Sequence, residues 1–272
     1  MAYPSTHPEP RALRSETGNR DGLGTGPAGW PEALPAQYEG VGGWASYRTH
    51  CPVCLGRLAP VPDNETVAHR FRHALWDDEA RCPLTTQSYQ PDGMTVRHMR
   101  DVALEGPQRG TFIGNWLRHY RVMRQLAPSL TVRRLTLLVD CADAANLWSY
   151  PSIVQHDLPY VLLVLAGFIR HQGPEGETLW MRFCFDGSVY DVGDMWRDAG
   201  LAPHLFRMVY RQPVDTPFPT SRELMHFRTV ERDRGFLDGP APRPSYSDAK
   251  VFERLLGGDD APEAAQSNAG AP

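Results

Sequence analysis

The sequence predicts an α+β fold, in which a small N-terminal cysteine-rich module precedes a mainly helical domain that carries a β-hairpin. Three observations favour this class. Three of the five cysteines lie close together before residue 83, apolar residues then recur at helical spacing, and the spacing changes to that of strands near residue 178. The ends of the chain are rich in proline, glycine and small polar residues without either period, so we expect disordered termini.

These changes in composition predict four segments. We expect a flexible N-terminal arm over residues 1–44, the cysteine-rich module over 45–92, the α+β domain over 93–255 and a disordered tail over 256–272. The chain has 272 residues, of which 41% are hydrophobic, and this is enough for one sizeable domain with a small appended one.

The location that we expect is the cytoplasm. The longest strongly apolar run, residues 160–169, is far shorter than the roughly 18 residues that a membrane helix needs, and the first residues lack the pattern of a secretory signal. Five unevenly spaced cysteines suit reduced thiols better than a disulfide framework. We therefore expect no membrane partner.

Helical spacing is clearest in "FIGNWLRHYRVMRQLA", residues 112–127. It places one apolar face opposite Arg118 and Arg121, and that face comprises Ile113, Trp116, Leu117, Tyr120 and Met123. Thr131 is a suitable N-cap for a second helix in "VRRLTLLVDCADAANLW". A third helix is expected in "DLPYVLLVLAGFIRH", residues 157–171.

Strand patterns follow these helices. "TLWMRFCF" and "SVYDV" flank Asp186-Gly187, a dipeptide typical of two-residue hairpin turns, so we expect a β-hairpin there. A short helix near "GDMWRDAG" and a strand in "HLFRMVYR" complete the domain. Cys141 and Cys184 stand inside apolar stretches, and we expect both to be small core residues.

The cysteine-rich module has the spacing of a zinc site, Cys51-x2-Cys54-x18-His73-x8-Cys82. A CxxC turn lets both thiolates reach one tetrahedral ion at about 2.3 Å. His69 lies four residues before His73, and a Cys2His2 set that uses both histidines without Cys82 is the alternative. Either set closes the coordination shell, so the sequence predicts a structural zinc ion and no catalytic residue.

A family resemblance rests on the same residues. "CPVC", then "FRH" and then "CP", within residues 51–83, resemble the N-terminal zinc module of CoiA-like competence proteins. In their following domain those proteins are similar to PD-(D/E)xK nucleases, which implies a divalent metal held by acidic residues and a lysine that assists phosphodiester hydrolysis. The acidic-x-Lys triplet of this chain is Asp248-Ala249-Lys250, in a polar stretch. A CoiA-like metal-dependent nuclease is therefore one alternative function.

A basic segment predicts contact with nucleic acid. The chain has a net charge of -4, but residues 95–135 contain eight arginines and only two acidic residues. We expect phosphate contacts from seven of the eight, namely Arg97, Arg100, Arg118, Arg121, Arg124, Arg133 and Arg134. The pattern favours neither DNA nor RNA. Lys250 is the only lysine, and the excess of arginine, alanine, glycine and proline is typical of a GC-rich bacterial genome.

Together these features predict a zinc-containing, nucleic-acid-binding protein that acts as a non-catalytic subunit of a bacterial nucleoprotein assembly. By analogy, genome defence (antiviral), CRISPR-type effector complexes and DNA uptake are suitable settings, and protein partners are expected in each. A second alternative is a transcriptional regulator in which residues 113–147 form a helix-turn-helix, with Arg133 and Arg134 near the start of the recognition helix.

Overall fold

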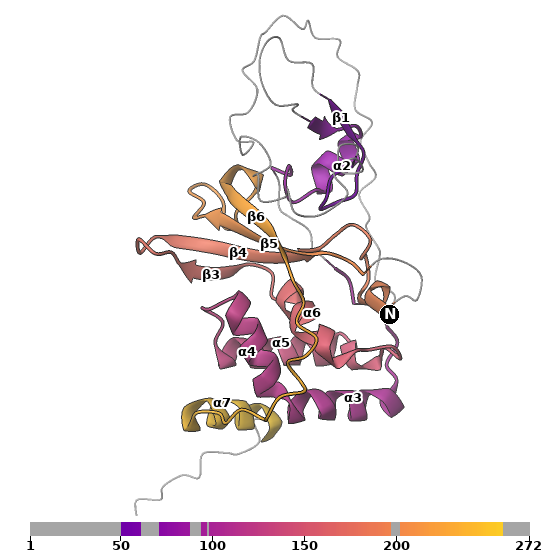
Figure 1. The fold of residues 1–272 in the computed structure, drawn as a ribbon, viewed down its shortest axis with the longest axis vertical. Coiled ribbons are helices and arrows are strands. Elements are labelled where there is room, and N and C mark those ends of the chain that lie inside the picture. The colour runs from indigo at the N-terminus through magenta and orange to yellow at the C-terminus, as the bar shows by residue number, and fades with distance from the viewer. Residues whose placement is uncertain (1–49, 61–70, 88–93, 97, 197–201, 258–272) are drawn as a thin grey trace, which may run out of the picture. The chain divides into compact units, whose positions relative to one another are not determined.

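The computed structural model describes residues 50–60, 71–87, 94–96, 98–196 and 202–257. The expected N-terminal arm lies outside the described residues, as does the expected tail except for its first two positions, which end the last helix. In chain order the elements are β1 (Leu58–Pro60), β2 (Phe71–His73), α2 (Trp76–Arg81), α3 (Val102–Gly114), α4 (Trp116–Leu126), α5 (Val132–Ala144), η2 (Leu147–Ser149), η3 (Gln155–Asp157), α6 (Leu158–Leu165), β3 (Ile169–Gln172), β4 (Thr178–Phe185), η4 (Val192–Trp196), β5 (Leu205–Arg211), η5 (Ser221–Glu223), β6 (Leu224–Val230) and α7 (Tyr246–Gly257). Helices and antiparallel sheets together confirm the α+β class (Figure 1).

The main sheet has four antiparallel strands in the order β3-β4-β5-β6. Successive side chains of a strand point to opposite faces, and in β4 nearly every side chain is buried, so both faces of this strand are covered. One face carries Met181 and Phe183, which belong to the core that the helices share. The other face carries Trp180 and Cys184, which pack in a second cluster with residues of the cysteine-rich module.

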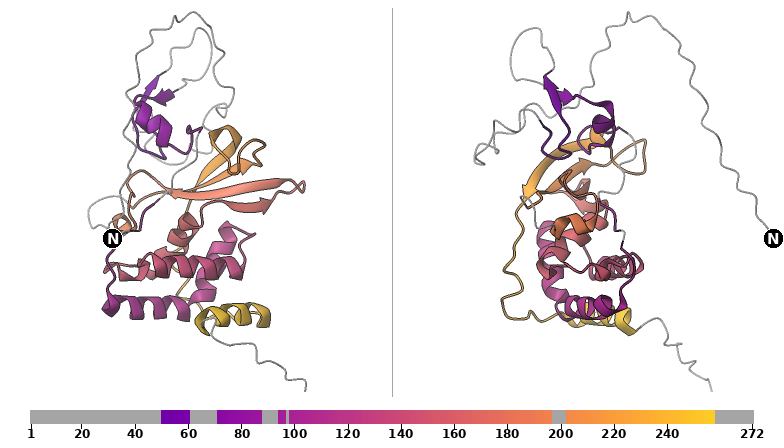
Figure 2. Two further views of the ribbon diagram at one scale, coloured as in Figure 1. Left: turned by 180° about the vertical axis from the view of Figure 1, so that it is seen from behind. Right: turned by 90° about the vertical axis from the view of Figure 1, so that its right-hand side faces the viewer.

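The helices α3 to α6 lie on one side of the sheet (Figures 1 and 2). Of the expected helix over residues 112–127, Trp116–Leu126 form α4, whereas residues 112–114 end α3. Thr131 caps α5 as predicted, because its side chain accepts a hydrogen bond from the Arg134 backbone N–H. Helix α3 was not anticipated. Asp101 caps α3 by accepting the N–H groups of Ala103 and Leu104, although Pro107 lies inside the helix.

The predicted hairpin at Asp186-Gly187 is wrong. Strand β4 pairs with β3 and β5, and residues 188–192 form no strand. The reason is the Asp186 carboxylate, which accepts the Ser188 N–H at 3.0 Å and the His204 N–H at 2.6 Å. These bonds close a local turn and join it to the start of β5, so the next strand in the sheet comes from residue 205 instead.

The third expected helix is shorter than predicted. Helix α6 ends at Leu165, and Gly167 adopts a φ of 61°, a left-handed conformation that favours glycine and ends the helix. Its last expected residues instead form β3, which pairs with β4. The strand in "HLFRMVYR" is confirmed as β5. The first four residues of "GDMWRDAG" belong to the 3₁₀ helix η4, and the other four, residues 197–200, lie outside the described part.

Of the two cysteines expected in the core, Cys184 is buried, whereas Cys141 is exposed on α5. Cys141 lies on the outer face of a helix whose buried positions are Leu138, Val139 and Ala142. Among the described helices, none is both long and apolar enough to cross a membrane.

Candidate metal centre

The CxxC segment forms a tight turn that brings two thiols to one side. Leu55 N–H donates to the Cys51 carbonyl at 2.9 Å, and Cys51 N–H donates to the Gly56 carbonyl at 2.8 Å. Leu55 has a φ of 59°, and the following Gly56 N–H donates to the Cys54 sulfur at 3.4 Å. An N–H directed at sulfur favours the thiolate, which is the form that binds metals.

The other two donors come from a hairpin and a helix end. His73 is the last residue of β2, where it pairs with Leu58 of β1. Cys82 follows α2 directly, and its N–H donates to the Asp78 carbonyl at 2.9 Å. The short β-hairpin and the short helix therefore hold His73 and Cys82 at fixed positions opposite the CxxC turn.

The four side chains form one tight group. Their potential ligand atoms all lie within 4.8 Å of one another, and among the described residues this is the group of histidine, cysteine and acidic side chains that can hold a metal ion. The sulfur atoms of Cys51 and Cys82 are 3.8 Å apart. Two thiolates on a tetrahedral ion, each about 2.3 Å from it, lie about 3.8 Å apart, so this distance fits such an ion.

The distance between the Cys54 sulfur and His73 Nε2 is shorter, at 3.1 Å. A tetrahedral zinc ion would place a thiolate sulfur and an imidazole nitrogen about 3.6 Å apart. The observed distance is that of a direct hydrogen bond, and a shift of about half an ångström would accommodate the ion. The donor set therefore fits a metal in identity, number and approximate spacing.

The four candidate ligands compete for protons, because hydrogen bonds among them shift their pKa values in opposite directions. Hydrogen bonds from Cys54 and Cys82 lower the pKa of Cys51, whereas the same network raises the pKa of Cys82, so the buried pair favours one thiolate and one thiol. Hydrogen bonds to Cys51 and Cys54 raise the pKa of His73 to about 10. A divalent cation would remove this conflict, because it stabilises several thiolates and a neutral imidazole at once.

The group is buried against the second face of the main sheet. Cys51, His73 and Cys82 are each less than 5% exposed, and Cys54 is half-buried. Cys51, Val53 and Cys82 share a hydrophobic cluster with side chains of the sheet, namely Trp180, Cys184, Phe206, Met208, Tyr210 and Phe227. The candidate metal group thus lies at the contact between the module and the sheet, where an ion would fasten one to the other.

Three further contacts join the module to the sheet. A Cβ atom at Gly187 would lie 2.3 Å from the Cys54 carbonyl oxygen, so the turn after β4 approaches the CxxC segment as closely as only glycine allows. Ser221 N–H donates to the Thr86 carbonyl at 3.0 Å, and Arg222 donates to the Gln87 side chain at 2.8 Å. Sequence reasoning explained Gly187 only as a turn residue and did not identify these docking contacts.

Every predicted ligand of the Cys3His set belongs to this group. His69, the alternative ligand, lies outside the described residues, so the Cys2His2 set that includes it stays a prediction.

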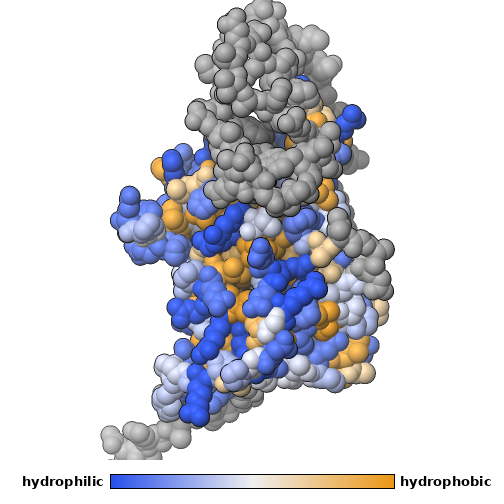
Figure 3. Space-filling model, viewed as in Figure 1, coloured by the Kyte–Doolittle hydropathy of each residue, from blue (hydrophilic) through white to orange (hydrophobic). Residues whose placement is uncertain are grey.

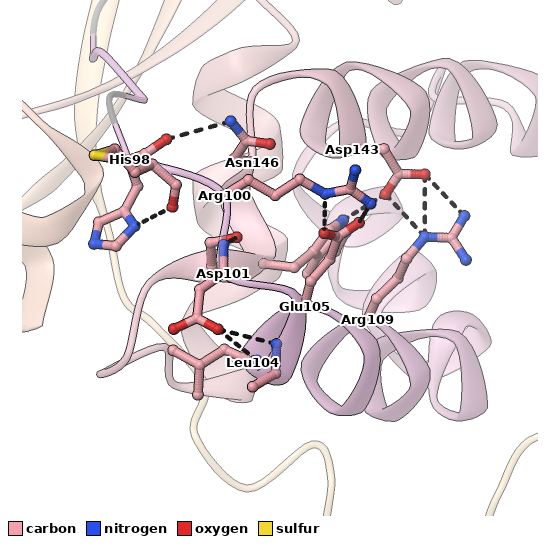
Figure 4. A network of polar contacts seen from close by, with 12 residues as sticks. His98, Arg100, Asp101, Leu104, Glu105, Arg109, Asp143 and Asn146 are labelled. Carbon is pink, nitrogen blue, oxygen red and sulfur yellow. Dashed lines mark hydrogen bonds and ion pairs between the residues drawn. The ribbon is translucent and has the colours of Figure 1, made fainter.

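The predicted phosphate-binding arginines have several different surroundings. Arg100 forms an ion pair with Glu105, with 2.6 Å between Nε and Oε2, on the exposed side of α3 (Figure 4). Arg118 donates to the carbonyls of Leu237 and Gly239, and it therefore anchors the segment after β6 on α4. Two further arginines also donate to backbone carbonyls, Arg124 to Pro128 at 3.3 Å and Arg134 to Ala166 at 2.9 Å.

The remaining three differ again. Arg121 and Arg133 are exposed and make no ion pair with the described residues, and Arg97 lies outside them. Arg109, which was not among the predicted contacts, forms a bidentate pair with Asp143, whose carboxylate also accepts the Trp148 indole N–H (Figure 4). Nucleic-acid contact through Arg121 and Arg133 stays a prediction.

The alternatives can also be placed in the fold. Asp248 and Lys250, of the acidic-x-Lys triplet of the nuclease alternative, lie in the first turns of the helix α7. Helices α4 and α5 are joined by a short turn, as the helix-turn-helix alternative requires.

Comparisons of the chain with protein-family models, with curated proteins and with solved structures found no match.

Proposed function

We propose that the protein binds nucleic acid as a non-catalytic subunit of a bacterial nucleoprotein assembly and that a structural zinc ion fastens its N-terminal module to the sheet. The observation that carries the proposal is the closed Cys3His group, buried between the module and the sheet. Four protein ligands leave a zinc ion no open position for water or substrate, so the ion stabilises the fold and takes no part in a reaction.

Zinc is the metal that suits this donor set best. Three thiols and one imidazole are soft or borderline donors, and a tetrahedral Cys3His shell is a common structural zinc site. Calcium and magnesium require oxygen ligands, and the group offers none.

The nucleic-acid part of the proposal depends on arginines that the fold itself does not use. Arg121 on α4 and Arg133 on α5 are exposed and form no ion pair within the described residues. Such side chains contact phosphates without a loss of internal contacts. The other helical arginines in this region stabilise loops or pair with acids, as described above.

Metal analysis of the purified protein tests the first part. We expect about one zinc ion per chain, and Cys54→Ser should lose most of it because one of four ligands is removed. Cys141→Ser is the matched control, since Cys141 is exposed on α5 and outside the group. Equal zinc content in both variants would contradict the assignment.

Binding of labelled DNA and RNA at several salt concentrations tests the second part. Replacing Arg121 and Arg133 by glutamine should weaken binding for all sequences alike and make its salt dependence shallower. The matched control replaces Arg243 and Arg254, which are exposed near and in α7, and removes the same charge. Cleavage of either nucleic acid with added magnesium or manganese would contradict a non-catalytic role.

A further inference from the structure

A second basic cluster lies on the main sheet, on the face that packs against the helices. Arg207 of β5 stands directly opposite Arg228 of β6, and Val209 stands opposite His226. Residues directly opposite one another, and alternate residues of one strand, point to the same face. Arg207, Arg211, His226 and Arg228 therefore lie on one face, beside the core residues Phe183 and Val209.

This cluster, which we term the β5–β6 basic face, has no counter-charge in the described part of the chain. None of its four side chains makes a hydrogen bond or ion pair with a described residue, and the Nε atom of half-buried Arg207 is buried without an acceptor. Arg232, which is better buried, instead pairs with Asp157 at 3.0 Å. The fold thus neutralises one buried arginine and leaves the neighbouring cluster without compensation.

The facing positive charges of this cluster lower the stability of the folded state. Like charges directly opposite on neighbouring strands repel one another. Burial and the nearby Arg228 lower the pKa of the Arg207 guanidinium, and partial burial, Arg207 and Arg228 lower the pKa of His226. A cluster that violates the ordinary rules of strand pairing without local compensation is typical of a surface kept for binding.

The geometry of the cluster suits an extended polyanion. Arg207 and Arg211 are four residues apart on β5, which corresponds to about 13 Å along the strand. A single free phosphate could contact only one end of such a row. Guanidinium groups bind phosphate oxygens with two parallel hydrogen bonds, and they do so without reading base sequence. Figure 3 shows hydrophilic side chains gathered over β6 and the segment after it, with hydrophobic ones between them.

We propose that the β5–β6 basic face binds the phosphate backbone of a nucleic acid, with Arg207 and Arg228 as the central contacts. This inference rests on the proposed nucleic-acid-binding function and names a surface for it that lies outside the basic helices and the metal centre. Binding should be independent of base sequence, because the contacts are to phosphates.

The test replaces Arg207 and Arg228 by glutamine in the full chain. The probes are fluorescent 20-nucleotide poly(dT) and poly(U) and a 20-base-pair DNA duplex, and the matched control is again the double replacement of Arg243 and Arg254. Loss of two phosphate contacts should reduce the slope of log affinity against log salt by about 1.4 for single strands and about 1.8 for duplex. If these contacts contribute nothing at 1 M salt, single-strand affinity should fall about 60-fold at 50 mM and about 10-fold at 200 mM salt.

A stability measurement separates binding from a structural role. Arg228 is exposed and forms no hydrogen bond or ion pair with described residues, so Arg228→Gln should leave the melting temperature unchanged or raise it, because the repulsion of Arg207 ends. The same single variant should still bind the probes more weakly than the parent. A melting temperature that falls together with the affinity would assign Arg228 a structural role and overturn the proposal.

The remaining outcomes are also decisive. The parent and the control variant are both expected to bind the probes. If the Arg207/Arg228 variant bound them with the same affinity as the control, the inference would be overturned and the proposed function would stay intact. A parent that binds no probe at 50 mM salt would contradict both. If polyglutamate displaces the probes at equal charge concentration, the face recognises acidic polypeptide, and the nucleic-acid assignment is wrong. Weaker binding with a shallower salt slope and an intact fold is the result that we expect.

Discussion

Gly187→Ala tests whether the metal centre and the sheet form one unit. The added Cβ would lie 2.3 Å from the Cys54 carbonyl oxygen and 2.7 Å from its carbon. Carbon and oxygen atoms in contact lie more than 3 Å apart, so the CxxC backbone must move by about 1 Å, and Cys54 is one of the four candidate ligands. Overpacking of this kind costs about 1–3 kcal/mol, and displaced supporting contacts lower metal affinity about 10–100-fold.

The assay measures zinc transfer to a chromogenic chelator together with unfolding in urea. The matched control is Gly110→Ala in α3, where an added Cβ meets no atom within 4 Å. That change should stabilise the protein by about 0.5–1 kcal/mol, because alanine favours the helix more than glycine does. If Gly187→Ala retained both zinc affinity and unfolding free energy at the level of the control, the close approach of Gly187 to Cys54 would be refuted, and with it the docking of the module.

Two further predictions concern Arg118 and the buried His119. Arg118→Gln should loosen the segment after β6, since its two carbonyl contacts are lost, and limited proteolysis should cut near Leu237 faster than in Arg121→Gln. Burial, with a smaller contribution from Arg118, lowers the pKa of His119 to about 3. The folded pKa is below the unfolded value, so this neutral histidine contributes stability that is complete above pH 6.5 and is lost at about 1.4 kcal/mol per unit as the pH falls toward 3. His119→Leu should therefore unfold less steeply with acid over that range, measured by urea titrations, and an unchanged slope would contradict this.

The candidate ligands could be predicted from the sequence because their chemistry is local. Cysteine and histidine are rare, and a CxxC turn needs only its own backbone to bring two thiols together. The sheet was harder to predict because its strands depend on distant partners. The edge strand β6, "LMHFRTV", buries only Phe227 and Val230 among its seven residues, so no clear alternation marks it in the sequence.

Helix α3 shows the opposite difficulty. Its sequence contains Gly106, Pro107 and Gly110, which lower helix propensity, and tertiary contacts compensate for them. Asp101 caps the helix, Arg109 pairs with Asp143 of α5, and Phe112 packs against Trp148 with 5.2 Å between ring centroids. None of these partners can be assigned before the chain is folded, so propensity alone predicts a loop.

The packing on the two faces of the sheet explains the position of the candidate metal group. One face carries Trp180, Phe206 and Met208, which share a hydrophobic cluster with residues of the cysteine-rich module, while Phe168 and Phe218 also contact the Trp180 ring. That module has few apolar residues of its own, so it cannot form a stable core without a fastening, and small domains commonly gain this from a metal. A metal ion held by the Cys3His group would therefore stabilise the module that packs on this apolar face. The β5–β6 basic face lies on the opposite side of the same strands, so loss of metal should expose the apolar face before it disturbs Arg207 and Arg228. Chelated protein should accordingly aggregate or bind apolar dyes while the helices keep their circular dichroism signal.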